Sequence, residues 1–156
     1  MPCWQKQDFY QSLVKQTESL ITGESNVIAN MANISALLFT SLEDINWAGF
    51  YLMDSPEELV LGPFQGNPAC IRIPVGKGVC GTAAQTQQTQ LVEDVHAFAG
   101  HIACDAASNS EVVVPIFKDG KVFAVLDIDS PSIARFDADD QAGLEALVKC
   151  FEANLK

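Results

Sequence analysis

The chain has few basic side chains. Nine lysines and arginines stand against twenty aspartates and glutamates among its 156 residues, which gives a formal net charge of −11. Binding to the phosphate backbone of a nucleic acid needs a basic surface, so the composition argues against that class of function. Acidity by itself favours solubility, and it has a functional meaning only where several carboxylates converge on one pocket.

Long apolar runs are also lacking. The longest, Val112–Phe117, contains a proline and is far too short to cross a bilayer. The first residues, Met1–Asp8, show no basic segment followed by an apolar stretch, so the sequence predicts no secretory signal. We therefore expect a cytoplasmic protein that does not bind a membrane.

Patterns typical of metal sites and of disulfide frameworks are missing as well. Five cysteines are an odd number, and no Cys-x-x-Cys pair occurs. The two histidines, His96 and His101, lack a zinc-type spacing to the cysteines, so no metal ligand is predicted. The cysteines are then either buried and inert or reactive thiols.

Hydrophobic periodicity predicts the order of the elements. Apolar residues recur every three or four positions over residues 5–40, which indicates helices. Residues 23–26 interrupt this pattern and offer Ser25 or Asn26 as a cap, so two helices are expected. A short helix is predicted over residues 79–86 and a last one over 137–155. From residue 46 the apolar period becomes two, and strands are predicted over residues 47–53, 58–64, 70–74, 90–95, 111–117 and 121–129.

Short turns between successive strands require largely antiparallel pairing. The predicted fold class is therefore α+β, with a largely antiparallel central β-sheet of about six strands and the N- and C-terminal helices packed on one side. No linker, repeat or low-complexity segment divides the chain. A single domain over residues 1–156 is expected, with the N-terminal helices at about 5–40, the sheet and the active site at about 46–130 and the C-terminal helix at about 137–155.

Two aspartates, Asp127 and Asp129, stand at the end of an apolar strand, on the face predicted to carry Phe123 and Val125. Aspartate is disfavoured inside strands. Its presence there has two explanations. The strand end emerges into solvent and both side chains are simply hydrated, or the carboxylates form a cluster that faces a pocket.

The register of the last hairpin decides whether Glu111 joins this cluster. A two-residue turn at Asp119–Gly120 would place Glu111 on the opposite face of the sheet. A three-residue turn, with Gly120 in a left-handed bulge, would pair Glu111 with Asp127 and bring the three carboxylates together. We favour the second register. Three clustered carboxylates repel one another, so at least one pKa should rise, and a bound ammonium group would relieve the repulsion.

Three cysteines lie in the middle third of the chain. Cys104 is in a loop of small residues just before the acidic hairpin, where a ligand can approach closely. Cys80 is near the start of the short helix, whose dipole would favour a thiolate, and Cys70 stands at the entrance of a strand. Redox chemistry needs an attacking thiolate and a second thiol that can reach it. Burial as small apolar side chains is the alternative for each of them, and it is the interpretation adopted for Cys3 and Cys150.

Several segments together resemble a known family, the free methionine-(R)-sulfoxide reductases, which are single GAF-domain enzymes. The resemblance extends through essentially the whole chain, and ordinary GAF sensor domains lack this set of three cysteines. The segments that carry it are Asn46–Tyr51, Gly62–Gly66, Ala69–Pro74, Gly76–Ala83, His101–Glu111 and Val125–Ser130.

The resemblance implies reduction of free L-methionine-(R)-sulfoxide, with thioredoxin as the source of electrons and no bound cofactor. It implies that Cys104 is the nucleophile, which attacks the sulfoxide sulfur and becomes a sulfenic acid. Cys70 would then condense with it to a disulfide that thioredoxin reduces. Cys80 would be an alternative or auxiliary resolving thiol.

The same resemblance assigns substrate binding. Glu111, Asp127 and Asp129 would hold the substrate's ammonium group and help to protonate the departing oxygen. Trp47 and Tyr51 would line the methylthio end of the pocket, although core packing explains them equally well. A peptide-bonded methionine sulfoxide lacks the cation, so it would leave repelling carboxylates unpaired at a cost of several kcal/mol.

Two other functions are compatible with the residues. One is a GAF-type sensor that binds a small ligand without chemistry, and the other is a thiol-based redox sensor in which a disulfide changes the oligomeric state. The exposed sheet edge, the N-terminal helices and the family resemblance favour a homodimer.

Overall fold

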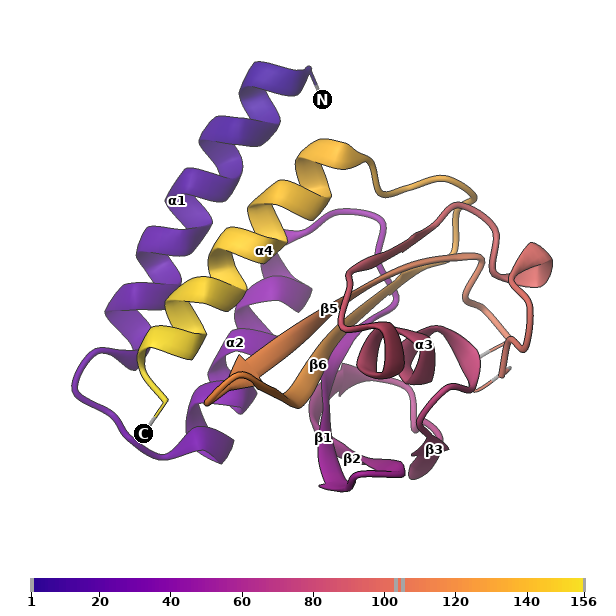
Figure 1. Ribbon diagram of the computed structural model, residues 1–156. Coiled ribbons are helices and arrows are strands. Elements are labelled where there is room, and N and C mark those ends of the chain that lie inside the picture. The colour runs from indigo at the N-terminus through magenta and orange to yellow at the C-terminus, as the bar shows by residue number, and fades with distance from the viewer. Residues whose placement is uncertain (1, 103, 105, 156) are drawn as a thin grey trace.

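A computed structural model describes residues 2–102, 104 and 106–155 (Figure 1). The helices are α1 (Cys3–Ile21), α2 (Val27–Ser41), α3 (Gly78–Thr86) and α4 (Ala138–Ala153), with a short 3-10 turn η1 (Val95–Ala97). The strands are β1 (Trp47–Ser55), β2 (Glu58–Gly66), β3 (Arg72–Pro74), β4 (Gln90–Val92), β5 (Ser110–Lys118) and β6 (Lys121–Ser130). Within the described part of the chain, no helix has the length and apolar character that crossing a membrane requires.

The six strands form one sheet in the order β3-β2-β1-β6-β5-β4, and every neighbouring pair is antiparallel. Helices α2 and α4 pack on one face of this sheet, and α1 lies outside them, so the N- and C-terminal helices share one side (Figure 1). Helix α3 covers the other face. This arrangement confirms the predicted α+β class and the predicted place of the terminal helices.

Some predicted elements differ in extent. The predicted strand over residues 70–74 begins only at Arg72, because Cys70 is bonded to Cys104 outside the sheet. The predicted edge strand over residues 90–95 ends at Val92 and is followed by η1. In the loop of small residues predicted around Cys104, positions 103 and 105 lie outside the described residues. The interpretation of Cys3 and Cys150 as buried side chains is wrong for Cys3, which is exposed as the first residue of α1, whereas Cys150 of α4 is half-buried.

Each face of the sheet covers its own apolar core. On β6, Ala124, Leu126 and Ile128 belong to the core on the helix side, which also contains residues of α1, α2 and α4. Val125 belongs to the second core, on the α3 side. Since successive side chains of a strand point to opposite faces, Asp127 and Asp129 lie on the α3 side with Val125.

The start of α4 is fastened to α1. Asp137 caps α4, and its side chain and that of Asp140 form a capping box. Lys6 of α1 donates to both carboxylates at 2.8 Å, and the Tyr10 hydroxyl donates to Asp140 at 2.7 Å. At the start of α2 the cap is Asn26, one of the two predicted candidates, which accepts a hydrogen bond from the Ala29 amide at 2.9 Å.

The turn between β5 and β6 differs from the predicted one. Asp119 and Gly120 have φ values of 54° and 76° and form a two-residue turn that pairs Lys118 with Lys121. Aspartate tolerates the left-handed conformation better than most residues, so Gly120 is not needed as a bulge. The predicted three-residue turn is therefore wrong.

A bulge further along the hairpin restores the predicted face. Phe117 pairs with Val122 and Ile116 with Ala124, so Phe123 is an extra residue in β6. Beyond this bulge Glu111 lies opposite Asp129, not opposite Asp127 as predicted. Phe123 packs against the helix-side core, so it does not share the face of the aspartates. The pairing was predicted wrongly, but the expectation of three carboxylates on one face is confirmed.

Candidate active site

A small cavity lies between α3, the loop before β5 and the face of the sheet that carries the carboxylates. Its volume is about 40 Å³. A buried water needs about 10–15 Å³ on this measure, so the cavity holds only a few waters. All but one of the predicted site residues line it: Trp47, Tyr51, Cys80, Cys104, Glu111, Asp127 and Asp129.

The remaining predicted residue, Cys70, is joined to Cys104 by a disulfide. The two Cα atoms are 5.3 Å apart, and the residues are 34 positions apart in the chain. The bond ties the segment before β3 to the loop before β5 beside the cavity. The structure thus brings together the thiol pair that the family resemblance implied. Cys80 is buried and lies outside this bond.

The three carboxylates lie on two neighbouring strands, Glu111 on β5 and the aspartates on β6. Their side chains are buried, with exposed fractions of 8% for Glu111, 5% for Asp127 and 9% for Asp129. Hydration at an emerging strand end would leave them exposed. The explanation of a cluster facing a pocket is therefore the correct one.

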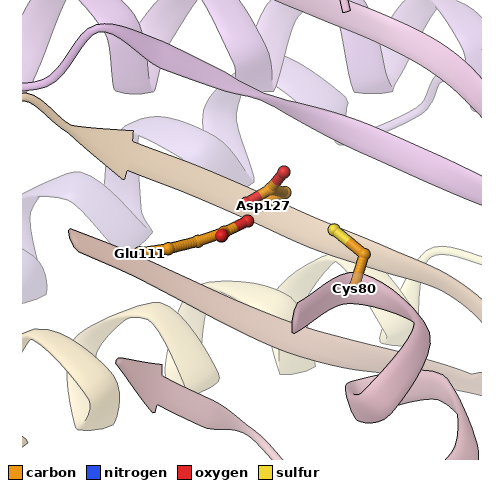
Figure 2. Close-up of side chains that lie close together, drawn as sticks. All are labelled: Cys80, Glu111 and Asp127. Atoms are coloured by element: carbon orange, nitrogen blue, oxygen red, sulfur yellow. The ribbon is translucent and has the colours of Figure 1, made fainter. Parts of the chain in front are cut away.

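Cys80 meets two of these acids. Its Sγ atom and one carboxylate oxygen each of Glu111 and Asp127 lie within 4.8 Å of one another. Figure 2 shows the thiol pointing from α3 toward the carboxylates on the strands beside it. The sequence did not predict this meeting, because contact between a helix and a sheet depends on packing and not on spacing along the chain.

Burial shifts the ionisation of the cluster. Burial is the largest cause of the rise in the pKa of Glu111 well above its usual value, and the charges of Asp127 and Asp129 raise this pKa further. Burial also raises the pKa of Asp127. The prediction that at least one carboxyl pKa rises is confirmed, although desolvation is a larger cause than repulsion.

The pKa of the Cys80 thiol is raised, whereas its place near the start of α3 predicted a lowered pKa. Burial raises the pKa of Cys80 well above its usual value, and the charges of Asp127 and Glu111 raise it further. These effects outweigh the dipole of a short helix. Cys80 is therefore a neutral thiol at neutral pH, able to donate a hydrogen bond to Asp127.

The Oδ1 atom of Asp127 is buried and, in the described part of the chain, accepts no hydrogen bond. Leaving a buried acceptor unsatisfied costs about 1–3 kcal/mol, and more when the group is charged. A ligand that brings a donor or a positive charge would remove this cost.

Two aromatic rings form a wall of the cavity. Trp47 stacks on Tyr51 and on Phe64, with ring centroids 5.9 and 5.0 Å apart. The Trp47 indole donates to the Asn67 carbonyl at 3.1 Å and the Tyr51 hydroxyl to the Cys70 carbonyl at 3.0 Å. Trp47 and Tyr51 belong to the second core, as the packing explanation expects, and they also line the cavity. Their contact with the methylthio end of a substrate stays a prediction.

Sequence reasoning missed other lining residues. His101, Ile102 and Ser108 come from the loop before β5, within the segment His101–Glu111 that carries the family resemblance, but none of them was predicted as a site residue. The Asn46 side chain donates to the Ser108 hydroxyl at 3.2 Å and so connects the start of β1 to this loop. Partial burial and the neighbouring His96 lower the pKa of His101 below its usual value.

The fold and the site together define an α+β small-molecule-binding domain with a thiol–carboxylate pocket on the sheet face opposite its terminal helices. Residues 29–149 match the GAF domain family. The free methionine-R-sulfoxide reductase of Escherichia coli is 54% identical over 147 residues, which cover 94% of this chain and 88% of that protein. The chain belongs to the GAF-domain family of free methionine-R-sulfoxide reductases.

Solved structures agree with this assignment. The fRMsr of Staphylococcus aureus in complex with substrate is 58% identical and superposes with a TM-score of 0.90, covering 94% of this chain and 95% of that one. The free methionine-R-sulfoxide reductase of Neisseria meningitidis in complex with its substrate is 45% identical with a TM-score of 0.92, covering 96% of this chain and 89% of that one.

Proposed function

We propose that this chain is an oxidoreductase that reduces free L-methionine-(R)-sulfoxide to L-methionine. The observation that carries the proposal is the Cys70–Cys104 disulfide beside a cavity with three buried carboxylates. The disulfide supplies a redox couple, and the carboxylates supply a binding site for a small cation. The names of the relatives, two of them solved with substrate, support the choice of substrate.

The proposed reaction uses both thiols. The Cys104 thiolate attacks the sulfoxide sulfur and forms an S–S bond, and the sulfoxide oxygen takes up a proton. The oxygen then transfers from the substrate sulfur to Cys104 as the S–S bond breaks, so methionine leaves and Cys104 becomes a sulfenic acid. The Cys70 thiol then attacks the sulfenic sulfur, which forms the disulfide and releases water. One sulfoxide and two thiols thus become one thioether, one disulfide and one water, and both electrons come from the protein.

A dithiol reductant of the thioredoxin class closes the cycle by exchange with the Cys70–Cys104 bond, and no prosthetic group is required. In this proposal the structure represents the oxidised enzyme, in which Cys70 and Cys104 are bonded. Its cavity of about 40 Å³ has no room for methionine sulfoxide, so the site must widen after reduction before the substrate binds. Cys80, buried and protonated, serves as an auxiliary thiol next to the carboxylates while Cys70 resolves the sulfenic acid.

Recognition of the free amino acid depends on charge. The ammonium group would lie against Glu111, Asp127 and Asp129, where it satisfies the unpartnered Asp127 oxygen. Glu111, whose raised pKa keeps it protonated longer than an ordinary glutamate, can donate a proton toward the sulfoxide oxygen. Trp47 and Tyr51 offer an apolar wall to the methylthio end.

The test is consumption of NADPH by the chain with thioredoxin and thioredoxin reductase. Turnover is expected with free methionine-(R)-sulfoxide, and none with the free S epimer or with the R epimer inside a peptide. Equal turnover of the peptide, or activity on the S epimer, would overturn the proposed recognition.

Cysteine variants separate catalysis from sensing. Cys104→Ser should release no methionine. Cys70→Ser, without small thiols, should release about one methionine per chain and then turn over much more slowly than the wild type, since only the buried, protonated Cys80 remains as an auxiliary thiol for the sulfenic acid. Cys150→Ser, on the distant face of α4, is the matched control and should keep full activity. A Cys104→Ser protein that still binds the sulfoxide, together with a wild type that never releases methionine, would indicate a sensor.

A further inference from the structure

The floor of the cavity carries a set of donors that suits a metal ion. One sulfur, from Cys80, and two carboxylate oxygens, from Glu111 and Asp127, lie within 4.8 Å of one another (Figure 2). They come from α3, β5 and β6, so three separate elements hold them in place. We propose that Cys80, Glu111 and Asp127 bind a thiophilic divalent cation of the Zn²⁺ class, independently of the Cys70–Cys104 pair.

The distances fit tetrahedral coordination after a small contraction. Zinc–sulfur bonds are about 2.3 Å and zinc–oxygen bonds about 2.0–2.2 Å, which places tetrahedral ligand atoms roughly 3.4–3.6 Å from one another. The donors lie within 4.8 Å of one another, so they need to approach by at most about 1.2–1.4 Å, and rotation of the long Glu111 side chain can supply part of this movement.

Burial and charge point to a cation at this place. The exposed fractions of Cys80, Glu111 and Asp127 are 4%, 8% and 5%. Among the described residues that line the cavity, none is a lysine or an arginine. The Oδ1 atom of Asp127, which lines the same cavity, has no hydrogen-bond donor. The cluster therefore offers buried donors that become anionic when a cation displaces their protons, and no lysine or arginine of the described lining lies beside them.

The donor types select the metal. Mg²⁺ and Ca²⁺ prefer sites made only of oxygen ligands, whereas a thiolate with two carboxylates suits Zn²⁺ and its spectroscopic substitute Co²⁺. Coordination replaces the S–H bond of Cys80 with a metal–sulfur bond and releases the proton to solvent. The adjacent space of about 40 Å³ admits a water as the fourth ligand.

The test is binding of Co²⁺ to the oxidised protein in a Cys3→Ser, Cys150→Ser background, in which Cys80 is the only thiol. One equivalent of Co²⁺ should produce a thiolate-to-cobalt charge-transfer band together with the visible bands of tetrahedral cobalt, and Zn²⁺ should displace it. Absence of the charge-transfer band would overturn the proposal.

Variants of the three ligands then identify the site. Cys80→Ser should abolish the charge-transfer band, and Asp127→Asn and Glu111→Gln should each weaken Co²⁺ binding by about tenfold or more. The two carboxamide variants keep the shape of the side chain, so they decide the question even if Cys80→Ser does not fold. A band whose affinity is the same in both carboxamide variants would place the metal elsewhere and overturn the assignment.

If the proposed function also holds, the cation and the substrate's ammonium occupy the same carboxylates. Methionine-(R)-sulfoxide should then displace Co²⁺ from a protein with the further substitutions Cys70→Ser and Cys104→Ser, in which no turnover can occur. Binding of Co²⁺ without displacement would contradict the assigned ammonium position and leave the metal site standing, so the two failures are distinguishable.

Discussion

Asp127 combines burial, a raised pKa and an oxygen without a partner in one side chain. Asp127→Asn keeps its shape and removes the charge. Loss of one partner of a buried charge pair costs about 2–5 kcal/mol, so kcat/KM for the free sulfoxide should fall about 30-fold or more, mainly through KM. Steady-state kinetics with thioredoxin measure this.

Asp119→Asn is the matched control for this substitution. It makes the same chemical change at an exposed turn position whose positive φ asparagine also tolerates. Its KM should equal that of the wild type. Wild-type kinetics in Asp127→Asn would show that the buried carboxylate has no part in binding the substrate.

Residue types predicted which residues line the cavity and that a carboxyl pKa rises, but not the ionisation of Cys80. The acids of the last hairpin stood out because aspartate is rare inside strands, and this signal is independent of the register. Cys80 was expected to be a thiolate from its place on a helix, yet its pKa is raised. Desolvation of Cys80 depends on how deeply α3 packs onto the sheet, and the local sequence does not predict that depth.

Among the elements, the β5–β6 hairpin shows that turn rules alone do not predict how two strands pair. The turn sequence Lys118–Gly120 permits loops of two or three residues, and counting outward from either assumes an unbroken ladder. The bulge at Phe123 interrupts this pairing. The three carboxylates were therefore predicted on the correct face of the sheet, although the predicted residue pairs were wrong. Phe123 packs on the helix-side core, and this tertiary contact was not visible in the strand pattern.

The contact between α1 and α4 depends on one glycine. A Cβ atom at Gly143 would lie 2.1 Å from the Tyr10 ring, whose hydroxyl is held by Asp140. Gly143→Ala should favour the helix by about 0.5–1 kcal/mol but cost about 1–3 kcal/mol in overpacking. The free energy of unfolding should fall by about 1–2 kcal/mol, measured by urea denaturation, whereas Ala142→Ser on the exposed side of α4 should change it by less than about 0.5 kcal/mol.

The contact between Lys6 and Asp137 at the start of α4 should stabilise the protein less at acidic pH. Partial burial alone would raise the pKa of Asp137, but hydrogen bonds from Lys6 and from the Asp140 amide lower it to about 2. The unfolded chain has an aspartate pKa of about 3.9. The contribution of Asp137 is therefore complete above pH 4 and lost as the pH falls toward 2.

Asp137→Asn tests this contribution, because asparagine still caps a helix but does not titrate in this range. The variant should lose less stability than the wild type between pH 4 and pH 2.5, as followed by urea denaturation at several pH values. Parallel pH profiles of the two proteins would contradict a role for the Asp137 charge.

The two faces of the sheet differ in what they carry: one packs against the long helices, and the other carries the candidate active site. The helix-side core is covered by α1, α2 and α4, whereas the α3 side carries the cavity, the disulfide and the carboxylates. The disulfide closes a loop of 34 positions. Such a cross-link restricts the unfolded chain and is worth about 3–4 kcal/mol in the entropic account.

Reduction of the Cys70–Cys104 bond should therefore lower the melting temperature by several degrees, measured by calorimetry with and without a phosphine reductant. Cys70→Ser already lacks the bond, so the reductant should leave its melting temperature unchanged. A wild-type melting temperature that does not respond to reductant would mean that native contacts alone hold the two loops together.

The bulge at Phe123 also governs how this hairpin can change in length. Phe123 lies opposite no residue of β5, so its loss would leave the pairs Phe117–Val122 and Ile116–Ala124 as they are. A residue lost between Ala124 and Asp129 would instead turn the aspartates toward the helices. When related sequences are aligned, a one-residue gap in this hairpin therefore belongs at position 123, and its placement decides whether the acidic residues of two proteins are matched as equivalents.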